Sequence, residues 1–199
     1  MEQNPNAIVK MSKVITAIEE WAYNYEQRYR YEFPGGTVIP KANIGAIRGG
    51  LPYIPEVTAG VCSIYVDVRL PPHETPVRVE SELRQLLKNI NIDADIEVYM
   101  FRRGYEGKNV SSLVEAIEKV HESEFHEKPK RVYPPITSMW RDINVFNEVG
   151  IPSVTYGPGH GITDPQQLRG EALKIADLYR ASRLYTLVSL DLCNRSRSA

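Results

Sequence analysis

Two groups of polar residues late in the chain have the types and spacing of a ligand site. Gly157-Pro158-Gly159-His160-Gly161 follows a β-branched and aromatic run, residues 153–156, which predicts a strand. The glycines allow a tight turn that places the His160 imidazole at the carboxyl end of that strand, where α/β folds collect their ligands. Arg141 and Asp142 open a short amphipathic pattern over residues 143–149.

Each group also has a simpler interpretation. His160 could be a turn histidine in solvent or a contact to a substrate. Arg141 and Asp142 could belong to an ordinary first helical turn, in which Asp142 favours the helix dipole and Arg141 is solvated. The pattern alone leaves these alternatives open.

The elements that position these groups are mostly helical. Apolar spacing predicts helices over residues 111–128 and 173–193, and a short helix after Asp142. Gly150 ends the short helix because glycine takes the left-handed cap conformation without steric cost, and Pro152 forbids its resumption. One or two strands are too little sheet to cover these helices, so this part is expected to be half of a domain.

The first half has a different order of elements. A helix is predicted from Pro5 to Arg28 with Asn4 as its cap, and a second helix starts at Thr75-Pro76. Strands are predicted over residues 37–48, 57–70 and 95–102. This order is a ferredoxin-like βαββαβ unit without its first strand, an antiparallel sheet with helices on one face. The missing strand is expected to leave exposed backbone groups. A glycine-punctuated stretch, residues 104–108, separates a domain 1–103 from a domain 104–199.

Composition excludes several classes of partner. The chain has 199 residues, of which 42% are hydrophobic and 25% charged, with a net charge of -1. Without a basic surplus, electrostatic binding of nucleic acid or membrane is not expected. The sequence shows neither a membrane-spanning run nor a signal-peptide layout. Cys62 and Cys193 have no CxxC partner and are expected to be buried free thiols in a reducing compartment. We therefore expect a cytoplasmic protein.

Several segments resemble the M20 metallopeptidase family, which includes the aminoacylase, acetylornithine deacetylase and succinyl-diaminopimelate desuccinylase type of amidohydrolase. SMWRDINVFNEVGIPSVTYGPG, residues 138–159, is similar to a late segment of the catalytic domain. EALKIADLYRASRLYTLVSLDLC, residues 171–193, is similar to the closing helix. In the first half, NPNAIVKMSKVI, KANIG with RGG, and YVDVRLP resemble the family's lid helix and lid strands.

The resemblance implies the organisation of the whole protein. Members of this family insert a ferredoxin-like lid, used for dimerisation, into a two-part zinc-binding catalytic domain. Residues 1–103 would be this lid without its first strand, and residues 104–199 the C-terminal segment of an α/β catalytic domain. The implied cofactor is zinc, one or two ions in the full-length parent. The implied partners are an N-acyl amino acid or small peptide as substrate and a second copy joined through the lid.

The resemblance also assigns roles to four residues. His160 lies near the family's last metal-ligating histidine, although it follows G-P-G directly instead of after several residues. Arg141 and Asp142 match the substrate-facing motif, where a guanidinium can hold a carboxylate with two parallel hydrogen bonds. Asn43, on a lid strand, would reach substrate across the closed cleft or from a dimer mate.

Other polar residues receive structural interpretations. Asp67 and Arg69 alternate in one strand, so they should face the same side and pair with neighbours. His73, His121 and His126 are expected at the surface.

The family's main metal-binding and catalytic residues are absent from this sequence. It contains no H-x-D motif, and its one adjacent glutamate pair, Glu19-Glu20, lies on the lid helix. One histidine cannot assemble a hydrolytic zinc site. We expect a C-terminal portion of a hydrolase that lacks catalytic residues, binds little or no zinc and is inactive alone. The alternative is a non-catalytic binding or dimerisation module, which the gene sequence upstream of Met1 would distinguish.

Overall fold

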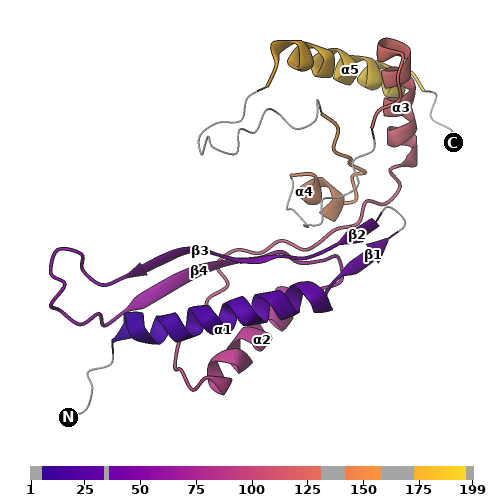
Figure 1. Cartoon of the computed structure of the whole chain (residues 1–199). Helices are drawn as coiled ribbons and strands as arrows, with labels where there is room; N and C mark the ends of the chain where they lie inside the picture. Colours follow the sequence, from indigo (N-terminus) through magenta and orange to yellow (C-terminus); the bar gives the residue numbers. More distant parts are fainter. Residues whose placement is uncertain (1–5, 34–35, 131–141, 158–172, 196–199) are drawn as a thin grey trace. The chain divides into compact units, whose positions relative to one another are not determined.

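The computed structural model describes residues 6–33, 36–130, 142–157 and 173–195. The chain divides into two compact units, the first running to Glu106 and the second beginning at Gly107 (Figure 1). Helices and small antiparallel sheets together confirm the predicted α+β class. None of the helices within the described ranges is both long and apolar enough to cross a membrane.

The first unit begins with helix α1, Ala7–Arg28. Asn6 is its cap: the side-chain oxygen accepts hydrogen bonds from the backbone of Ile8 at 3.0 Å and of Val9 at 3.4 Å. The helix thus starts two residues later than predicted, because Asn6 satisfies its first free N–H groups. The predicted cap, Asn4, lies outside the described residues.

Two antiparallel hairpins follow. Strand β1, Tyr31–Phe33, pairs with β2, Gly36–Val38, and the longer β3, Ala42–Gly49, pairs with β4, Cys62–Val68. The single strand predicted over residues 37–48 is therefore wrong: it is two strands, separated at Pro40, which has no N–H for a ladder. The strand predicted over residues 57–70 is shorter at both ends. A register shift between Ile44 and Ala46 marks a bulge at Gly45.

Helix α2, Pro76–Asn89, starts as predicted, with Thr75 as cap and Pro76 in the first turn. The side chains of α1 and α2 form the core of this unit, over one face of the β3–β4 sheet. The buried members of this core are Val14, Ile18, Trp21, Ala22, Tyr25, Tyr29, Val79 and Leu87. The partly buried sheet residues packed against them are Ala42, Ile44, Ile64, Val66 and Val68.

The third strand predicted in this unit, over residues 95–102, is not formed. Among the described residues, 93–109 make no backbone–backbone hydrogen bond. The segment has strand-forming side chains, but a strand also needs a neighbour to complete its ladder. None of the described strands pairs with it.

The second unit contains helices α3, Ser111–Phe125, α4, Ile143–Glu148, and α5, Ile175–Cys193. Helix α3 stops before the predicted end at residue 128, because His126 adopts a left-handed φ of 56°. The predicted cap of α4 is confirmed: Gly150 has φ 80°, and hydrogen bonds from Gly150 to Asn147 and from Ile151 to Phe146 make a Schellman motif. Residues 153–156 form no strand, since no described segment pairs with them.

Helices α3 and α5 pack on each other through a small core of Ala116, Val120, Leu184 and Val188. Two ion pairs of 2.7 Å, Lys119 with Asp191 and Arg183 with Glu124, join the same helices. Many large apolar side chains nevertheless stay exposed on this unit. They include Phe146, Val149, Ile151, Ile175, Leu178 and Tyr179. Such exposure is typical of a unit that packs against a further layer.

Candidate functional site

The face of the β3–β4 sheet turned away from the helices is polar. Along β4, side chains alternate between half-buried ones such as Val66 and exposed ones such as Asp67. Asn43 on β3 lies directly opposite Asp67, and both are exposed. Because opposite residues share a face of the sheet, the Asn43 amide and the Asp67 carboxylate lie on this open face.

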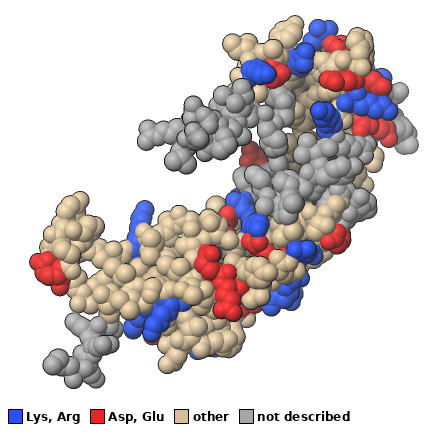
Figure 2. All heavy atoms as spheres, in the orientation of Figure 1, with Lys and Arg blue, Asp and Glu red and all other residues tan. Residues whose placement is uncertain are grey.

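Charged and aromatic groups extend this face. Arg69 Nη2 lies 2.7 Å from Asp67 Oδ2, so the two residues share a side, as predicted, and pair with each other, although Arg69 lies one residue past the end of β4. The guanidinium of Arg48 lies 5.6 Å from the centre of the Tyr65 ring. The open face, defined by Asn43, Arg48, Tyr65, Asp67 and Arg69, thus offers an amide, a carboxylate, guanidinium groups and a phenol. These groups can hydrogen-bond a polar ligand, and charges of both signs are interspersed on the visible surface (Figure 2).

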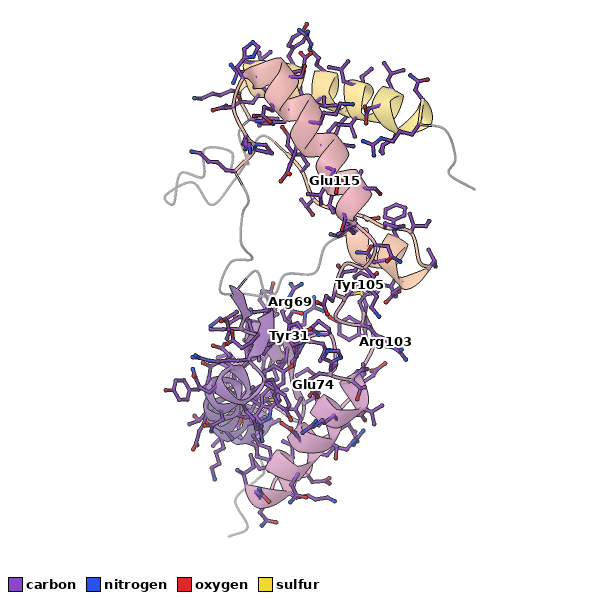
Figure 3. The ribbon with its side chains drawn as sticks, turned by 90° about the vertical axis from the view of Figure 1, so that its right-hand side faces the viewer. Tyr31, Arg69, Glu74, Arg103, Tyr105 and Glu115 are labelled. Atoms are coloured by element: carbon purple, nitrogen blue, oxygen red, sulfur yellow. The ribbon has the colours of Figure 1, made fainter. Side chains whose placement is uncertain are left out.

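One end of the first unit gathers further polar groups, among which Figure 3 labels Tyr31, Arg69 and Glu74. The Tyr31 hydroxyl donates to Glu106 Oε2 at 2.8 Å, and this bond, with some burial, raises the pKa of Tyr31. The imidazole of His73 meets the Tyr31 ring edge-on at 5.3 Å. His73 is exposed, as predicted.

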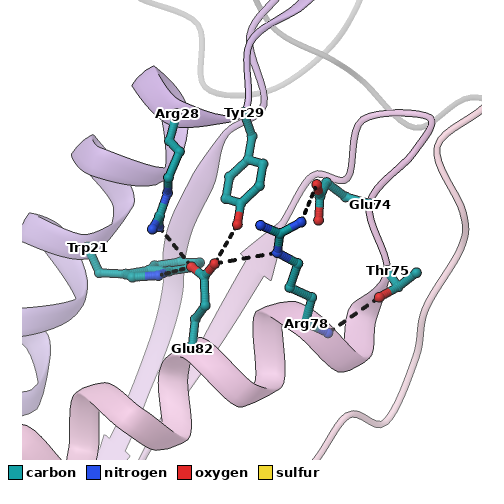
Figure 4. A network of polar contacts seen from close by, with 7 residues as sticks. All are labelled: Trp21, Arg28, Tyr29, Glu74, Thr75, Arg78 and Glu82. Atoms are coloured by element: carbon teal, nitrogen blue, oxygen red, sulfur yellow. Dashed lines mark hydrogen bonds and ion pairs between the residues drawn. The ribbon is translucent and has the colours of Figure 1, made fainter.

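Sequence reasoning missed a network centred on Glu82 of α2 (Figure 4). Its carboxylate accepts from Trp21 Nε1 at 2.9 Å, from the Tyr29 hydroxyl at 2.5 Å and from Arg28 Nη2 at 2.9 Å. Arg78, one turn earlier, lies 4.0 Å away and also bonds Glu74 at 3.2 Å. The network ties α1 to α2 at the rim of a groove between them, so its role is structural. The one sequence signal was the position of Glu82 beside Leu83 on the apolar side of α2.

Glu82 makes stability depend on pH. Partial burial alone would raise the pKa of Glu82, but hydrogen bonds from Tyr29 and Trp21 and the charges of Arg28 and Arg78 outweigh it and lower the pKa. A carboxyl group whose pKa is lower in the folded than in the unfolded chain stabilises the fold at any pH above the unfolded pKa of about 4.3. This stabilisation is lost as the pH falls through the pKa of the folded chain. Glu82→Gln should therefore reduce the free energy of unfolding by about 1–3 kcal/mol at pH 7.

Urea denaturation followed by tryptophan fluorescence at several pH values measures this effect. The difference between wild type and Glu82→Gln should shrink below pH ~4, where the wild-type carboxylate also becomes protonated. Glu80→Gln is the matched control, a half-buried glutamate of the same helix that pairs with Arg84 of α2 and not with α1. If the difference in free energy of unfolding between the two proteins stayed constant across the acid range, the charge of Glu82 would not be the source of the stabilisation.

The structure describes two of the four predicted site residues. Asn43 lies on the open face of the first unit, and Asp142, in the second unit, is exposed at the start of α4. The Asp142 side chain makes no capping hydrogen bond. Arg141 and His160 lie outside the described residues.

His121 differs from its predicted surface position. It is half-buried, its Nδ1 lies 2.7 Å from the Tyr156 hydroxyl, and its ring meets Phe125 edge-on at 4.8 Å. Tyr185 in turn donates to the backbone oxygen of Tyr156 at 2.5 Å. Burial, and then the neighbouring Tyr185, raise the pKa of Tyr156. These contacts fix the segment after α4 onto α3 and α5, and they depend on residues 29 and 35 positions apart, which spacing rules do not connect.

The described residues do not fit a zinc site. In the described ranges, no three His, Cys, Asp or Glu side chains come together closely enough to hold a metal ion. A hydrolytic zinc needs about three protein ligands and an open position.

Comparison with known proteins matches the first unit. Residues 2–95 match the family described as the peptidase dimerisation domain, of the M20 type. The match spans α1, both hairpins and α2, and so includes the open face with Asn43.

Proposed function

Because residues 2–95 belong to the peptidase dimerisation domain of the M20 family, we propose that this chain is the lid and the distal catalytic segment of a metal-dependent amidohydrolase. The substrate class is an N-acyl amino acid or a small peptide, whose amide C–N bond the full-length enzyme hydrolyses. The family match carries this proposal. It rests secondarily on the open face, whose donors and acceptors suit a substrate with an amide and a carboxylate.

The proposed site residues have distinct roles. Asn43 donates from the open face to the acyl or peptide oxygen, and Arg141, with Asp142 beside it, holds the substrate carboxylate. His160 supplies one metal ligand in the parent enzyme, which uses one or two zinc ions. The assignments of Arg141, Asp142 and His160 rest on their match to the family's motifs.

The remaining catalytic groups belong to another part of the parent. This sequence has no H-x-D motif, and the second unit exposes apolar residues that a catalytic sheet would cover. We therefore expect this chain to be inactive alone.

Zinc titration and activity assays test that expectation. Calorimetry with Zn²⁺ should show weak binding or none, and N-acetyl amino acids or dipeptides with Zn²⁺ present should be hydrolysed no faster than in buffer, since one histidine cannot build the site. His160→Ala should behave like the wild type in both experiments. Tight binding at one zinc per chain, lost in His160→Ala, would contradict the proposal.

The chain is also expected to form a homodimer through the lid. The connection between β3 and β4 exposes Leu51, Tyr53, Ile54, Val57 and Val61, and Tyr53 is 95% exposed. Exposed apolar patches with an aromatic residue are typical of interfaces. Light scattering should report twice the chain mass of 22.6 kDa.

Charged substitutions test this surface. Tyr53→Glu combined with Val57→Glu should weaken the dimer roughly tenfold or more, because charges are poorly tolerated at an interface core. Tyr179→Glu is the control, since Tyr179 is a similarly exposed aromatic residue in the second unit. A monomeric wild type, or equal effects of the two variants, would argue against the lid connection as the interface.

A second candidate function is a non-catalytic dimerisation module. The family match itself favours it, since the matched domain is the dimerisation domain and not a catalytic one. An antibody against the lid distinguishes the two on an immunoblot of source-cell lysate. A band well above 22.6 kDa supports the amidohydrolase parent, and a band at that mass supports the module.

A further inference from the structure

The open face of the β3–β4 sheet extends well beyond Asn43. Helices α1 and α2 lie on the other face of this sheet (Figure 1). Along the open face, three cross-strand pairs follow one another: Asn43 opposite Asp67, Ala46 opposite Tyr65, and Arg48 opposite Ser63. Neighbouring pairs on one face of a strand are about 7 Å apart, so the three pairs span roughly 13 Å. That length matches about four residues of an extended peptide.

The charges on the open face do not cancel. Asp67 and Arg69 neutralise each other at 2.7 Å. Arg48 is exposed, and among the described residues its guanidinium contacts the Tyr65 ring and pairs with no carboxylate. The described part of the open face therefore keeps one positive charge that a ligand can neutralise.

The Arg48 guanidinium is held in position by its surroundings. It lies 5.6 Å from the centre of the Tyr65 ring, a cation–π distance, and this contact leaves its N–H groups available for two parallel bonds to a carboxylate. The next residue fixes the backbone, since a Cβ on Gly49 would stand 2.7 Å from Cys62 Sγ. Ser63, directly opposite Arg48, adds a hydroxyl donor on the same face.

We propose that Arg48, Ser63 and Tyr65 form a carboxylate subsite, which selects a small peptide with an acidic residue over an N-acyl amino acid without one. This selection rests on the proposed function, in which Asn43 meets the carbonyl of the scissile bond and Arg141 holds the terminal carboxylate. The group bound at Arg48 is then a second carboxylate, on the amino side of the scissile bond.

The spacing sets where the acidic residue lies in the peptide. Because the Arg48 guanidinium leans over Tyr65, it lies between one and two cross-strand pairs from Asn43, about 7–13 Å. In an extended peptide, a Glu side chain one or two residues before the scissile carbonyl covers the shorter part of this distance. The preferred substrate therefore carries its acidic residue at one of these two positions.

Two probes that differ by one carboxylate test the subsite: acetyl-Glu-Gly-Ala and acetyl-Gln-Gly-Ala, each also made with a second glycine to cover both spacings. Nuclear magnetic resonance of the isotope-labelled chain follows their binding. Both probes should shift the side-chain amide signal of Asn43, and the Glu probe should also shift the backbone amides of Ser63 and Tyr65. At one spacing or both, the Glu probe should bind roughly fivefold more tightly, and about 0.5 M salt should reduce this preference.

Variants of the chain assign the preference to Arg48. Arg48→Gln should abolish it while both probes still shift the Asn43 signal. Arg48→Lys should keep part of it, because the charge remains and the planar fork is lost. Arg84→Gln is the control, since Arg84 is an exposed arginine of α2 and pairs with Glu80 of its own helix. It should keep the full fivefold preference.

Two outcomes overturn the subsite and leave the proposed function standing, because hydrolysis by the full-length parent does not require it. They are equal binding of the Glu and Gln probes at both spacings, and a preference that survives Arg48→Gln. If no probe shifts the Asn43 signal at about 20 mM, the subsite and the role of Asn43 in substrate binding are both wrong, while the family match of residues 2–95 is unaffected.

Discussion

Tyr25→Ala is expected to lower the free energy of unfolding of the first unit by about 3–5 kcal/mol, the range for deleting a large buried aromatic side chain. Tyr25 is fully buried, and its ring centre lies 4.9 Å from those of both Trp21 and Tyr29. Its hydroxyl donates to the Arg69 carbonyl at 3.0 Å, which ties α1 to the end of β4. Removing the ring leaves a cavity at the centre of the helix–sheet contact.

Urea denaturation of three variants separates the contribution of the buried Tyr25 ring to stability from that of its hydroxyl hydrogen bond. Tyr25→Phe keeps the ring and loses one hydrogen bond, so it should cost about 1 kcal/mol. Tyr23→Ala removes a tyrosine that is 67% exposed on the same helix and should change stability by less than about 0.5 kcal/mol. If Tyr25→Ala cost no more than Tyr23→Ala, the described core of this unit would be wrong.

The pH dependence gives an independent check on Tyr25. Burial, and then the nearby charges of Glu74, Tyr29 and Glu82, raise the pKa of Tyr25 far above its ordinary value. A raised tyrosine pKa means that the stabilisation is present below the unfolded pKa of about 10 and is lost above it. Tyr25→Phe should therefore lose less stability than wild type on going from pH 9 to pH 11.

Leu184→Ala is the second substitution with a large expected effect: it should lower the free energy of unfolding of the second unit by about 2–5 kcal/mol. Leu184 is fully buried in the α3–α5 contact among Ala116, Val120 and Val188. This contact is the main apolar core of the described part of the second unit. The loss should appear as faster hydrogen exchange in α3 and α5, with α1 and α2 unchanged.

Leu190→Ala is the matched control, because Leu190 lies on the same helix and is 53% exposed. It should leave the exchange rates of α3 and α5 within a factor of about two of wild type, as expected for a surface substitution. Equal acceleration by the two variants would mean that α3 and α5 do not pack as described.

The stability of the first unit matters for the proposed function, because this unit is the proposed lid. The family match covers the unit in which Tyr25 and Glu82 hold α1 and α2 together above the sheet, and Asn43 lies on the opposite, open face. A loss of the core would move the strand that carries Asn43, so Tyr25→Ala should also weaken dimer formation. Substitution of Asn43 itself should leave folding intact, since its side chain is exposed.

Local patterns in the sequence determined which segments are helices and some of the helix ends, such as the start of α2 and the end of α4. Thr75 and Gly150 act within one turn of their own helices, so neighbouring residues are sufficient to predict them. That Asp67 and Arg69 face the same side was predictable for a similar local reason, because side chains alternate along any strand.

Only the tertiary structure decided which extended segments became strands and which polar groups met. Residues 95–102 and 153–156 have strand-forming side chains but no described partner, and a ladder requires two strands. Glu82 meets Trp21 across 61 positions of sequence, and His121 meets Tyr156 across 35. Such contacts are set by how the helices pack, because hydrogen bonds between distant residues depend on distances in space that no spacing in the sequence encodes.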